Sequence, residues 1–251
     1  MSRFSDFLRR AKNTSCSVVV VAAGASTRMG EDKLFMDLAG KPVLARTLTA
    51  LNACSCVDEI VVVTRLESLE KVAALCREYR VDKVGKVVVG GASRTESALA
   101  GLVQIRRNAK YVLIHDGARP LITTEAIDHA IDVLVSDRAL DGVVCGQPAI
   151  DTLKIVDGDN IVETPPRELY WAAQTPQIFS VDAMKRAHAA AIAEGFIGTD
   201  DSSLVERMGG RVRCVQSPRD NLKVTVPEDL RPVTAILLGR MAEGEDLPHV
   251  Q

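Results

Sequence analysis

Short apolar runs rich in β-branched residues alternate with amphipathic segments along the whole chain of 251 residues. The apolar runs predict six strands, over residues 17–23, 59–64, 86–89, 111–115, 142–146 and 211–215. Between them lie segments such as residues 124–135, whose apolar positions fall on one face of a helix. Strands that are apolar throughout and are separated by helices are typical of a parallel sheet covered on both faces. The pattern therefore predicts an α/β fold with a mostly parallel sheet and helices on both of its faces.

One segment interrupts this alternation, DTLKIVDGDNIVETPPREL at residues 151–169. It predicts two short strands around Asp157-Gly158, a dipeptide typical of hairpin turns. An isolated hairpin is only marginally stable in water. This one presents a set of apolar side chains, Leu153, Ile155, Ile161 and Val162. We therefore expect a protruding β-hairpin arm at about residues 150–170 that rests on the body of its own subunit or on another subunit.

Composition and charge narrow the classes of function. Hydrophobic residues make up 47% of the chain and charged residues 25%, which is typical of a folded globular protein. The formal net charge of -2 gives no general attraction to nucleic acid or to an anionic membrane, so an anion site must be a local cluster of cations. No segment has the length of a secretory signal or a membrane span, so we expect a cytoplasmic protein. Because there are no repeats or long linkers, we predict a single domain over residues 17–251, preceded by an N-terminal extension over residues 1–16.

The six cysteines are scattered, at positions 16, 54, 56, 76, 145 and 214. Cys54-Ser55-Cys56 is the only close pair, and neither a second pair nor a nearby histidine completes a zinc-binding set. We therefore interpret the cysteines as isolated thiols of a reducing compartment rather than as metal ligands.

The loop after the first predicted strand, AAGASTRMGEDK at residues 22–33, carries two cations, Arg28 and Lys33. Loops of this kind often bind phosphate, because backbone N–H groups and cationic side chains converge there. The loop is not a P-loop, since Glu31 follows Gly30 where that motif has lysine, and it also lacks the second glycine of the dinucleotide fingerprint. Phosphate binding therefore needs support from other parts of the chain.

Three later loops add small and charged residues at predicted strand ends. GGASRTES follows the third strand, HDGARP ends the fourth and supplies Asp116, and SPRDNLKVT supplies Asp220 and Lys223. In parallel sheets, ligands collect at the carboxyl ends of the strands. Two carboxylates and a ring of cations at that edge suit Mg²⁺ with a nucleoside triphosphate, because Mg²⁺ takes one or two carboxylates together with phosphate oxygens.

Other kinds of catalytic site find little support in the sequence. It contains neither the GxSxG nucleophile motif nor the HExxH zinc motif. His115 beside Asp116 could act as an acid or a base, but a histidine in a strand-end turn more often makes a structural hydrogen bond, and we favour that interpretation. Tyr170 and Trp171 could stack on a nucleotide base, but we expect them to pack at the root of the arm.

Seven segments carry a more specific signal: AAGASTRMGEDKLFMDLAGKPVL, GGASRTESALAGL, IHDGARPLI, DTLKIV, QTPQIF, GTDDSS and DNLKVTVPEDL. In this order, over roughly residues 17–240, they resemble the 2-C-methyl-D-erythritol 4-phosphate cytidylyltransferases of the non-mevalonate isoprenoid pathway. The resemblance implies a Rossmann-like fold, the substrates CTP and methylerythritol phosphate, Mg²⁺ as cofactor, and release of pyrophosphate. It also implies a homodimer in which the arm crosses to the second subunit.

The resemblance further implies roles for individual residues. The cytidine site would be lined by Ala22, Ala23, Gly24, Gly90, Gly91 and Ser97. The triphosphate would be surrounded by three catalytic cations, Arg28, Lys33 and Lys223. Asp116 and Asp220 would lie near the metal, with Asp116 also close to the ribose. The methylerythritol phosphate would be held by Thr152, Arg167, Thr175 and Thr199, of which Thr152 and Arg167 would serve the neighbouring subunit's site.

Two alternatives remain at this point. Ribitol-5-phosphate cytidylyltransferases share most of the same segments and differ in the polyol phosphate. A nucleotide-binding module without turnover is the other alternative, although a mere sensor would not need Lys33, Lys223 and two carboxylates together. In each case we expect a nucleotide ligand and neither nucleic acid nor a membrane as partner.

Overall fold

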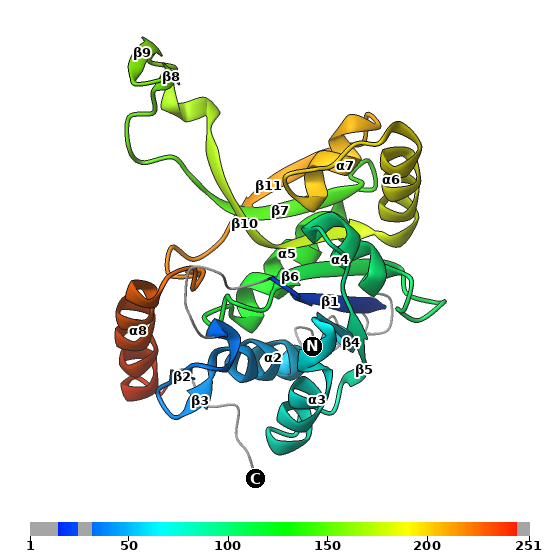
Figure 1. Cartoon of the computed structure of the whole chain (residues 1–251). Coiled ribbons are helices and arrows are strands. Elements are labelled where there is room, and N and C mark those ends of the chain that lie inside the picture. Colours follow the sequence, from blue (N-terminus) through cyan, green and yellow to red (C-terminus); the bar gives the residue numbers. More distant parts are fainter. Residues whose placement is uncertain (1–14, 25–31, 245–251) are drawn as a thin grey trace, which may run out of the picture.

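The computed structural model describes residues 15–24 and 32–244, and its arrangement is shown in Figure 1. Seven strands build the central sheet: β1 Cys16–Ala22, β4 Val57–Thr64, β5 Val84–Val89, β6 Tyr111–Asp116, β7 Gly142–Pro148, β10 Trp171–Ser180 and β11 Val212–Gln216. Their order across the sheet is β11-β7-β10-β6-β1-β4-β5. All six predicted strands are present, and their ends lie within two residues of the predicted ends.

The strand that the sequence pattern did not reveal is β10, which runs antiparallel to both of its neighbours, β6 and β7. It contains Pro176, and a proline argues against the interior of a strand because it has no N–H to donate. The pairing of β10 with β7 is irregular between Ala173 and Gln177, so the proline lies where the regular ladder is interrupted. The other neighbouring strands pair in parallel, which confirms the α/β fold with a mostly parallel sheet.

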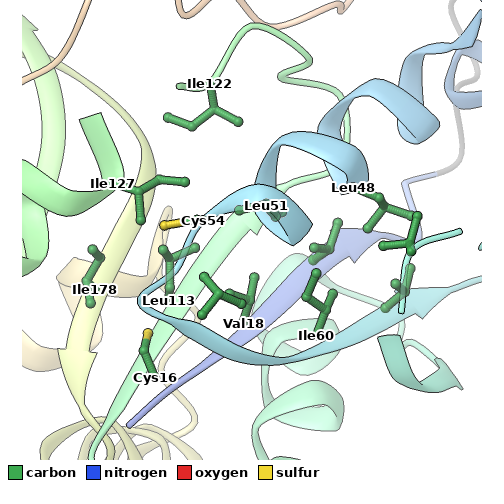
Figure 2. Packing of buried hydrophobic residues seen from close by; sticks show 14 of the residues in the cluster. Cys16, Val18, Leu48, Leu51, Cys54, Ile60, Leu113, Ile122, Ile127 and Ile178 are labelled. Atoms are coloured by element: carbon green, nitrogen blue, oxygen red, sulfur yellow. The ribbon is translucent and has the colours of Figure 1, made fainter. Parts of the chain in front are cut away.

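Helices cover both faces of the sheet. Successive strand residues point to opposite faces, and each face carries apolar side chains that the helices bury. Val18 and Leu113 belong to one apolar cluster, shown in Figure 2, and their neighbours Val19 and Val112 belong to the other. The first cluster packs under α2 Val43–Ala53, α3 Leu69–Glu78 and α5 Thr124–Ser136. The second packs under α4 Arg94–Leu102, α6 Val181–Glu194 and α7 Asp201–Arg207.

Helix α4 lies unusually close to the sheet at Gly101. A Cβ atom added there would lie only 2.3 Å from Cγ1 of Val19 on β1, so a larger residue would force the helix away from the strand. This close packing holds α4, which begins at Arg94, against β1.

A third, smaller apolar cluster attaches the last described helix, α8 (Leu230–Ala242), to the rest of the protein. In it, Val233 and Leu237 of α8 pack with Leu121 and with Val224, the residue after Lys223. Short elements complete the chain: η1 Lys33–Phe35, β2 Asp37–Leu38, β3 Lys41–Pro42, η2 Leu66–Ser68, η3 Arg167–Leu169 and η4 Pro227–Asp229. Within the described residues, no helix has both the length and the apolar character needed to cross a membrane.

The predicted hairpin is formed by β8 (Ile155–Asp157) and β9 (Asn160–Glu163), and it projects away from the body of the subunit (Figure 1). We call residues 149–170 the arm, because the backbone N–H of Ala149 donates to the carbonyl of Tyr170 at its base (2.9 Å). Four apolar side chains of the hairpin are 45–65% exposed: Ile155, Val156, Ile161 and Val162. They do not pack on the body of their own subunit.

Candidate functional site

A pocket of about 280 Å³ opens at the carboxyl ends of β1 and β6, beside the loop that follows β5. It brings together five separate stretches of the chain, because parallel strands present their following loops at one edge of the sheet. The residues that line it are Val21, Ala22, Ala23, Gly24, Lys33, Leu34, Gly91, Ala92, Ser93, Arg94, Ser97, Asp116, Ala118 and Lys223. Eight of the residues expected at the site are therefore gathered around one pocket.

Asp116, the last residue of β6, lies among three cations. Its carboxylate is 2.9 Å from Nζ of Lys223, 3.5 Å from Nε of Arg94 and 3.4 Å from Nε of Arg119. Burial by itself would raise the pKa of this carboxyl, but the charges of Lys223, Arg94 and Arg119 outweigh burial and hold the pKa well below its ordinary value. Asp116 is consequently an anion at any physiological pH.

Arg94 connects Asp116 to the start of α7. Its Nη1 lies 2.7 Å from Oδ2 of Asp201, a residue that is only 1% exposed. Burial would lower the pKa of the Arg94 guanidinium, but Asp201 and Asp116 outweigh it and raise this pKa above its ordinary value. The guanidinium thus remains charged in a partly buried position. Arg94 belongs to the GGASRTES segment after the third predicted strand. Its ion pair with Asp201 could not be predicted from the sequence, because the two residues are 107 positions apart.

The loop that carries Lys223 is held by polar contacts with β10 and with the loop that follows β6. Nδ2 of the fully buried Asn221 donates to the carbonyl of Thr175 (2.8 Å), and Nη1 of Arg119 donates to the carbonyl of Asn221 (2.9 Å). The backbone N–H of Val224 donates to the carbonyl of Ala118 (2.8 Å). These contacts position Lys223 beside Asp116. Sequence reasoning missed Asn221, for which the only signal was its place inside the DNLKVT segment.

Of the two cations in the loop after β1, the structure describes Lys33 and does not describe Arg28. Lys33 opens the short helix η1 and lines the pocket. That helix is capped by Asp32, whose Oδ1 accepts from the backbone N–H of Leu34 (3.3 Å) and whose Oδ2 pairs with Arg65 (2.5 Å). Lys33 is therefore placed by a capped and anchored turn.

The two glycines after β5 have different positions. Gly91 lines the pocket, and its backbone N–H donates to Oγ of Ser97 (3.2 Å). Gly90 is not among the lining residues. A Cβ atom on Gly90 would lie 2.7 Å from both Cβ of Ala23 and Oγ of Ser97, so this glycine permits the close packing of the residues that do line the pocket.

Asp220 points toward α8 rather than into the pocket. Its Oδ2 accepts from Nη2 of Arg240 (2.6 Å), and it is not one of the lining residues. Its Oδ1 is buried and has no hydrogen-bond partner among the described residues. The structure thus places Asp220 in the same loop as Lys223 but does not bring its carboxylate to that of Asp116.

The four residues expected to hold the polyol phosphate lie in three places. Thr175 is buried, and its Oγ1 accepts from the backbone N–H of Asp116 (3.0 Å). Thr199 is exposed in the loop before α7. Thr152 and Arg167 are exposed on the arm, where Nη1 of Arg167 donates to the carbonyl of Ile150 (2.8 Å). Thr175 is thus joined to the pocket by its hydrogen bond with Asp116.

His115 agrees with its structural interpretation, and the aromatic pair lies at the expected root of the arm but is exposed there. The His115 ring is fully buried, and its Nε2 lies 3.4 Å from the carbonyl oxygen of Arg119. Burial lowers the pKa of His115 to about 4, so the ring is neutral at physiological pH. Tyr170 and Trp171 lie where the arm joins β10, each 38% exposed.

Comparison with known proteins identifies relatives over most of the chain. A family model described as IspD, 2-C-methyl-D-erythritol 4-phosphate cytidylyltransferase, matches residues 16–239. The 2-C-methyl-D-erythritol 4-phosphate cytidylyltransferase of Caldanaerobacter subterraneus is 43% identical over 222 residues, which cover 85% of this chain and 95% of the relative. The protein of the same name from Halalkalibacterium halodurans is 41% identical over 223 residues, covering 88% and 96%. The crystal structure of 4-diphosphocytidyl-2C-methyl-D-erythritol synthase from Anaerococcus prevotii superposes with a TM-score of 0.80 at 28% identity, covering 92% of this chain and 99% of that one.

The α/β sheet, the cation-lined pocket at the carboxyl ends of its strands and these matches together define a nucleotidyltransferase. Both the family model and the relatives narrow this class to one activity. The chain belongs to the 2-C-methyl-D-erythritol 4-phosphate cytidylyltransferase family. The family that the seven sequence segments indicated is thereby confirmed.

Proposed function

We propose that this protein transfers the CMP group of CTP to 2-C-methyl-D-erythritol 4-phosphate, giving 4-diphosphocytidyl-2-C-methyl-D-erythritol and pyrophosphate. The product serves the synthesis of isoprenoid precursors. The observation that carries the proposal is the pocket in which Asp116 and Lys223 form an ion pair beside Lys33, in a chain of this family. The reaction requires a triphosphate and a monophosphate to meet, and cations fixed in advance reduce the repulsion between these two anions.

The chemistry asks for charge stabilisation rather than proton transfer. A phosphate oxygen of the polyol phosphate attacks the α-phosphorus of CTP, and the bond from that phosphorus to the oxygen bridging the β-phosphorus breaks. The attacking phosphate is already an anion, so no general base is needed. We assign to Lys33 and Lys223 the stabilisation of charge on the pentacoordinate phosphorus and on the departing pyrophosphate. Arg28, outside the described residues, receives the same assignment.

We assign the cytidine to the wall formed by small residues. Ala22, Ala23 and Gly24 line the pocket on one side, and Gly91 and Ser97 line it on another. Side chains of this size leave backbone N–H and C=O groups exposed to the base, and they form a site that a larger purine would overfill. Gly90 supports this wall by packing and does not itself contact the pocket.

We assign Mg²⁺ as the cofactor and Asp116 as its main protein ligand. Asp116 is ionised, and it is the one carboxylate among the described residues that line the pocket. Mg²⁺ takes one or two carboxylates together with phosphate oxygens and water, and it would neutralise charge on the triphosphate. For Asp220, the support is its buried Oδ1, an acceptor without a described partner. We propose Asp220 as a second ligand, which would have to turn from Arg240 toward the pocket to reach the ion.

We propose that the active protein is a homodimer and that the arm completes the site of the partner subunit. Thr152 and Arg167 lie on the arm, away from the pocket residues of their own subunit, and the hairpin leaves its apolar side chains exposed. In a dimer, those side chains can be covered and Arg167 can offer its planar fork to the phosphate of the polyol. Thr175 and Thr199 complete the polyol phosphate site from the body.

The chain organisation and location remain part of this proposal. We propose a single catalytic domain over residues 17–251, with the arm at about residues 150–170 and residues 1–16 as an N-terminal extension. A cytoplasmic location suits an enzyme that uses CTP and a phosphorylated polyol.

A pyrophosphate-release assay with CTP and each of two polyol phosphates tests the proposal. We expect turnover with 2-C-methyl-D-erythritol 4-phosphate and little with ribitol 5-phosphate. Turnover with ribitol 5-phosphate alone would assign the protein to the ribitol enzymes. Binding of CTP without turnover of either polyol phosphate would indicate a nucleotide-binding module, against which the cluster of Lys33, Lys223 and Asp116 argues.

A further inference from the structure

Two thiols meet at the end of the sheet opposite the pocket. Cys54 follows α2 and Cys56 precedes β4, so both lie at the amino ends of the parallel strands, whereas the pocket lies at their carboxyl ends. The backbone N–H of Val57 donates to the carbonyl of Cys54 (3.3 Å) and closes a tight turn. This turn brings the two Sγ atoms to 3.0 Å from each other.

A carboxylate from a distant part of the chain completes the group. Oδ1 of Asp128, on α5, lies 3.5 Å from Sγ of Cys54, although the two residues are 74 positions apart. Helices α2 and α5 pack on the same face of the sheet, where Cys54 and Ile127, the residue before Asp128, share one apolar cluster (Figure 2). One possible ligand atom from each of Cys54, Cys56 and Asp128 lies within 4.8 Å of the other two. The sequence showed only the cysteine pair, which by itself did not indicate a metal site.

The distances resemble those of a tetrahedral zinc site. With Zn–S bonds of about 2.3 Å and Zn–O bonds of about 2.1 Å, the two sulfurs would lie roughly 3.8 Å apart and a sulfur and an oxygen roughly 3.6 Å apart. The separation of Cys54 Sγ and Asp128 Oδ1 already matches, and the sulfurs need to separate by only roughly 0.8 Å. A disulfide would instead require them to approach to about 2.05 Å and would require an oxidant.

The surroundings also suit a cation. Cys54 is fully buried, while Cys56 and Asp128 are partly exposed, so an ion can enter from the side of Cys56 and Asp128. Nζ of Lys83 donates to the carbonyl of Cys54 (2.6 Å) and places one positive charge beside the ligands. This charge partly offsets the negative charge that two thiolates and a carboxylate would leave around a divalent ion.

We propose that Cys54, Cys56 and Asp128 bind Zn²⁺, or a similarly thiophilic divalent cation, and so fasten α2 and β4 to α5. The two thiols release their protons to solvent when the ion binds, and a water molecule takes the fourth position. The site is structural, because it lies at the edge of the sheet away from the pocket.

Metal titration of the reduced full-length protein tests this site, with Co²⁺ as a spectroscopic probe and Zn²⁺ as its competitor. We expect one equivalent of Co²⁺ to produce sulfur-to-cobalt charge-transfer absorption that Zn²⁺ removes. Cys54→Ser and Cys56→Ser should each abolish the absorption. Asp128→Asn should weaken binding at least about tenfold, since even partners outside the first coordination sphere are worth about 10- to 100-fold. Cys214→Ser, which removes an exposed cysteine elsewhere, is the matched control and should bind normally.

Thermal unfolding provides a second measurement. Zn²⁺ at about 100 times its dissociation constant should raise the Tm of the wild-type protein by about 5–10 °C, and a chelator should reverse the shift. Circular dichroism shows whether Cys54→Ser folds. If it does not, the test rests on Cys56→Ser and Asp128→Asn, which change partly exposed residues. Absence of the charge-transfer band in the reduced wild-type protein, an equal band in Cys56→Ser, or unchanged affinity in Asp128→Asn would each overturn the proposal.

Discussion

Asp116 illustrates how single residues prepare the pocket before any substrate binds. Its carboxylate is held in the charged form by Lys223, Arg94 and Arg119, although burial opposes that charge. The same ion pairs keep Lys223 and Arg94 directed toward the pocket rather than into solvent. We expect an incoming triphosphate to exchange with Asp116 as the partner of Lys223, so that the lysine passes from one anion to another without being left unpaired in a partly buried place.

The first prediction concerns Lys33. Charge on the transferring phosphorus and on the pyrophosphate grows toward the transition state, so Lys33→Ala should lower kcat by about 100- to 1,000-fold. Steady-state kinetics with both substrates would measure this effect. Lys185→Ala, on the exposed face of α6, is the matched control and should leave kcat unchanged. A near-normal kcat with a raised KM for CTP would instead make Lys33 a ground-state binder.

The second prediction concerns the metal. Asp116→Asn removes a hard anionic ligand, so the variant should need a higher Mg²⁺ concentration for half-maximal activity. A magnesium titration of activity would show the shift. Asp182→Asn, which changes an exposed carboxylate on α6, should not alter the titration. If Asp116→Asn titrates like the wild-type protein, Asp116 is not a metal ligand.

At the scale of elements, the parallel strands were predictable and the antiparallel strand was not. A strand buried on both faces is apolar along its length, so β1, β4 and β6 are visible in the local pattern. Strand β10 contains Pro176 and polar residues, and it owes its place to its two neighbours. In the candidate site, too, some features were predictable from the local sequence and others depended on tertiary packing. Cations at strand ends could be anticipated, but the pairing of Arg94 with Asp201 depends on how α4 and α7 pack.

The third prediction concerns helix α6 and pH. His188 on α6 is buried, and burial lowers its pKa from 6.5 to about 4. The unfolded chain therefore binds this proton more readily than the folded protein does. The resulting stability is fully present above about pH 6.5 and is lost as the pH falls toward about 4. Between about pH 7 and pH 5, this histidine should reduce the free energy of unfolding by about 2 kcal/mol.

Urea denaturation at a series of pH values would measure this effect. His188→Leu should remove about 2 kcal/mol of the decrease between about pH 7 and pH 5. The exposed His129→Gln on α5 is the matched control and should keep the wild-type pH dependence. An unchanged slope in His188→Leu would show that other groups, such as the buried His115, account for the loss of stability in acid.

At the scale of the whole molecule, the arm separates residues that the proposed reaction needs together. Arg167 lies on the arm, whereas Lys33 and Asp116 line the pocket in the body. The hairpin of β8 and β9 leaves four apolar side chains exposed, and an isolated hairpin is only marginally stable in water. A two-fold symmetric dimer resolves both features, because one arm can be covered by its copy while its arginine reaches the partner's pocket.

The fourth prediction tests this arrangement by mixing two impaired variants. Arg167→Ala should raise KM for the polyol phosphate far more than KM for CTP. In a mixed dimer of Arg167→Ala and Lys33→Ala chains, one site would contain both lesions and the other would contain neither. An equal mixture after subunit exchange should therefore recover about a quarter of the wild-type activity. If exchange is demonstrated and activity stays at the level of the separate variants, Arg167 acts within its own chain.

The sequence alone determined the parallel sheet, the hairpin and the loops that carry Lys33, Asp116 and Lys223, because each is a local property of the chain. A buried strand must be apolar, a hairpin needs its turn residues, and the loops after parallel strands must meet at one edge of the sheet. Tertiary structure alone decided the insertion of β10, the turning of Asp220 toward Arg240 and the meeting of Cys54 with Asp128. These contacts join residues far apart in sequence, and many weak packing interactions act together to decide which distant segments lie side by side.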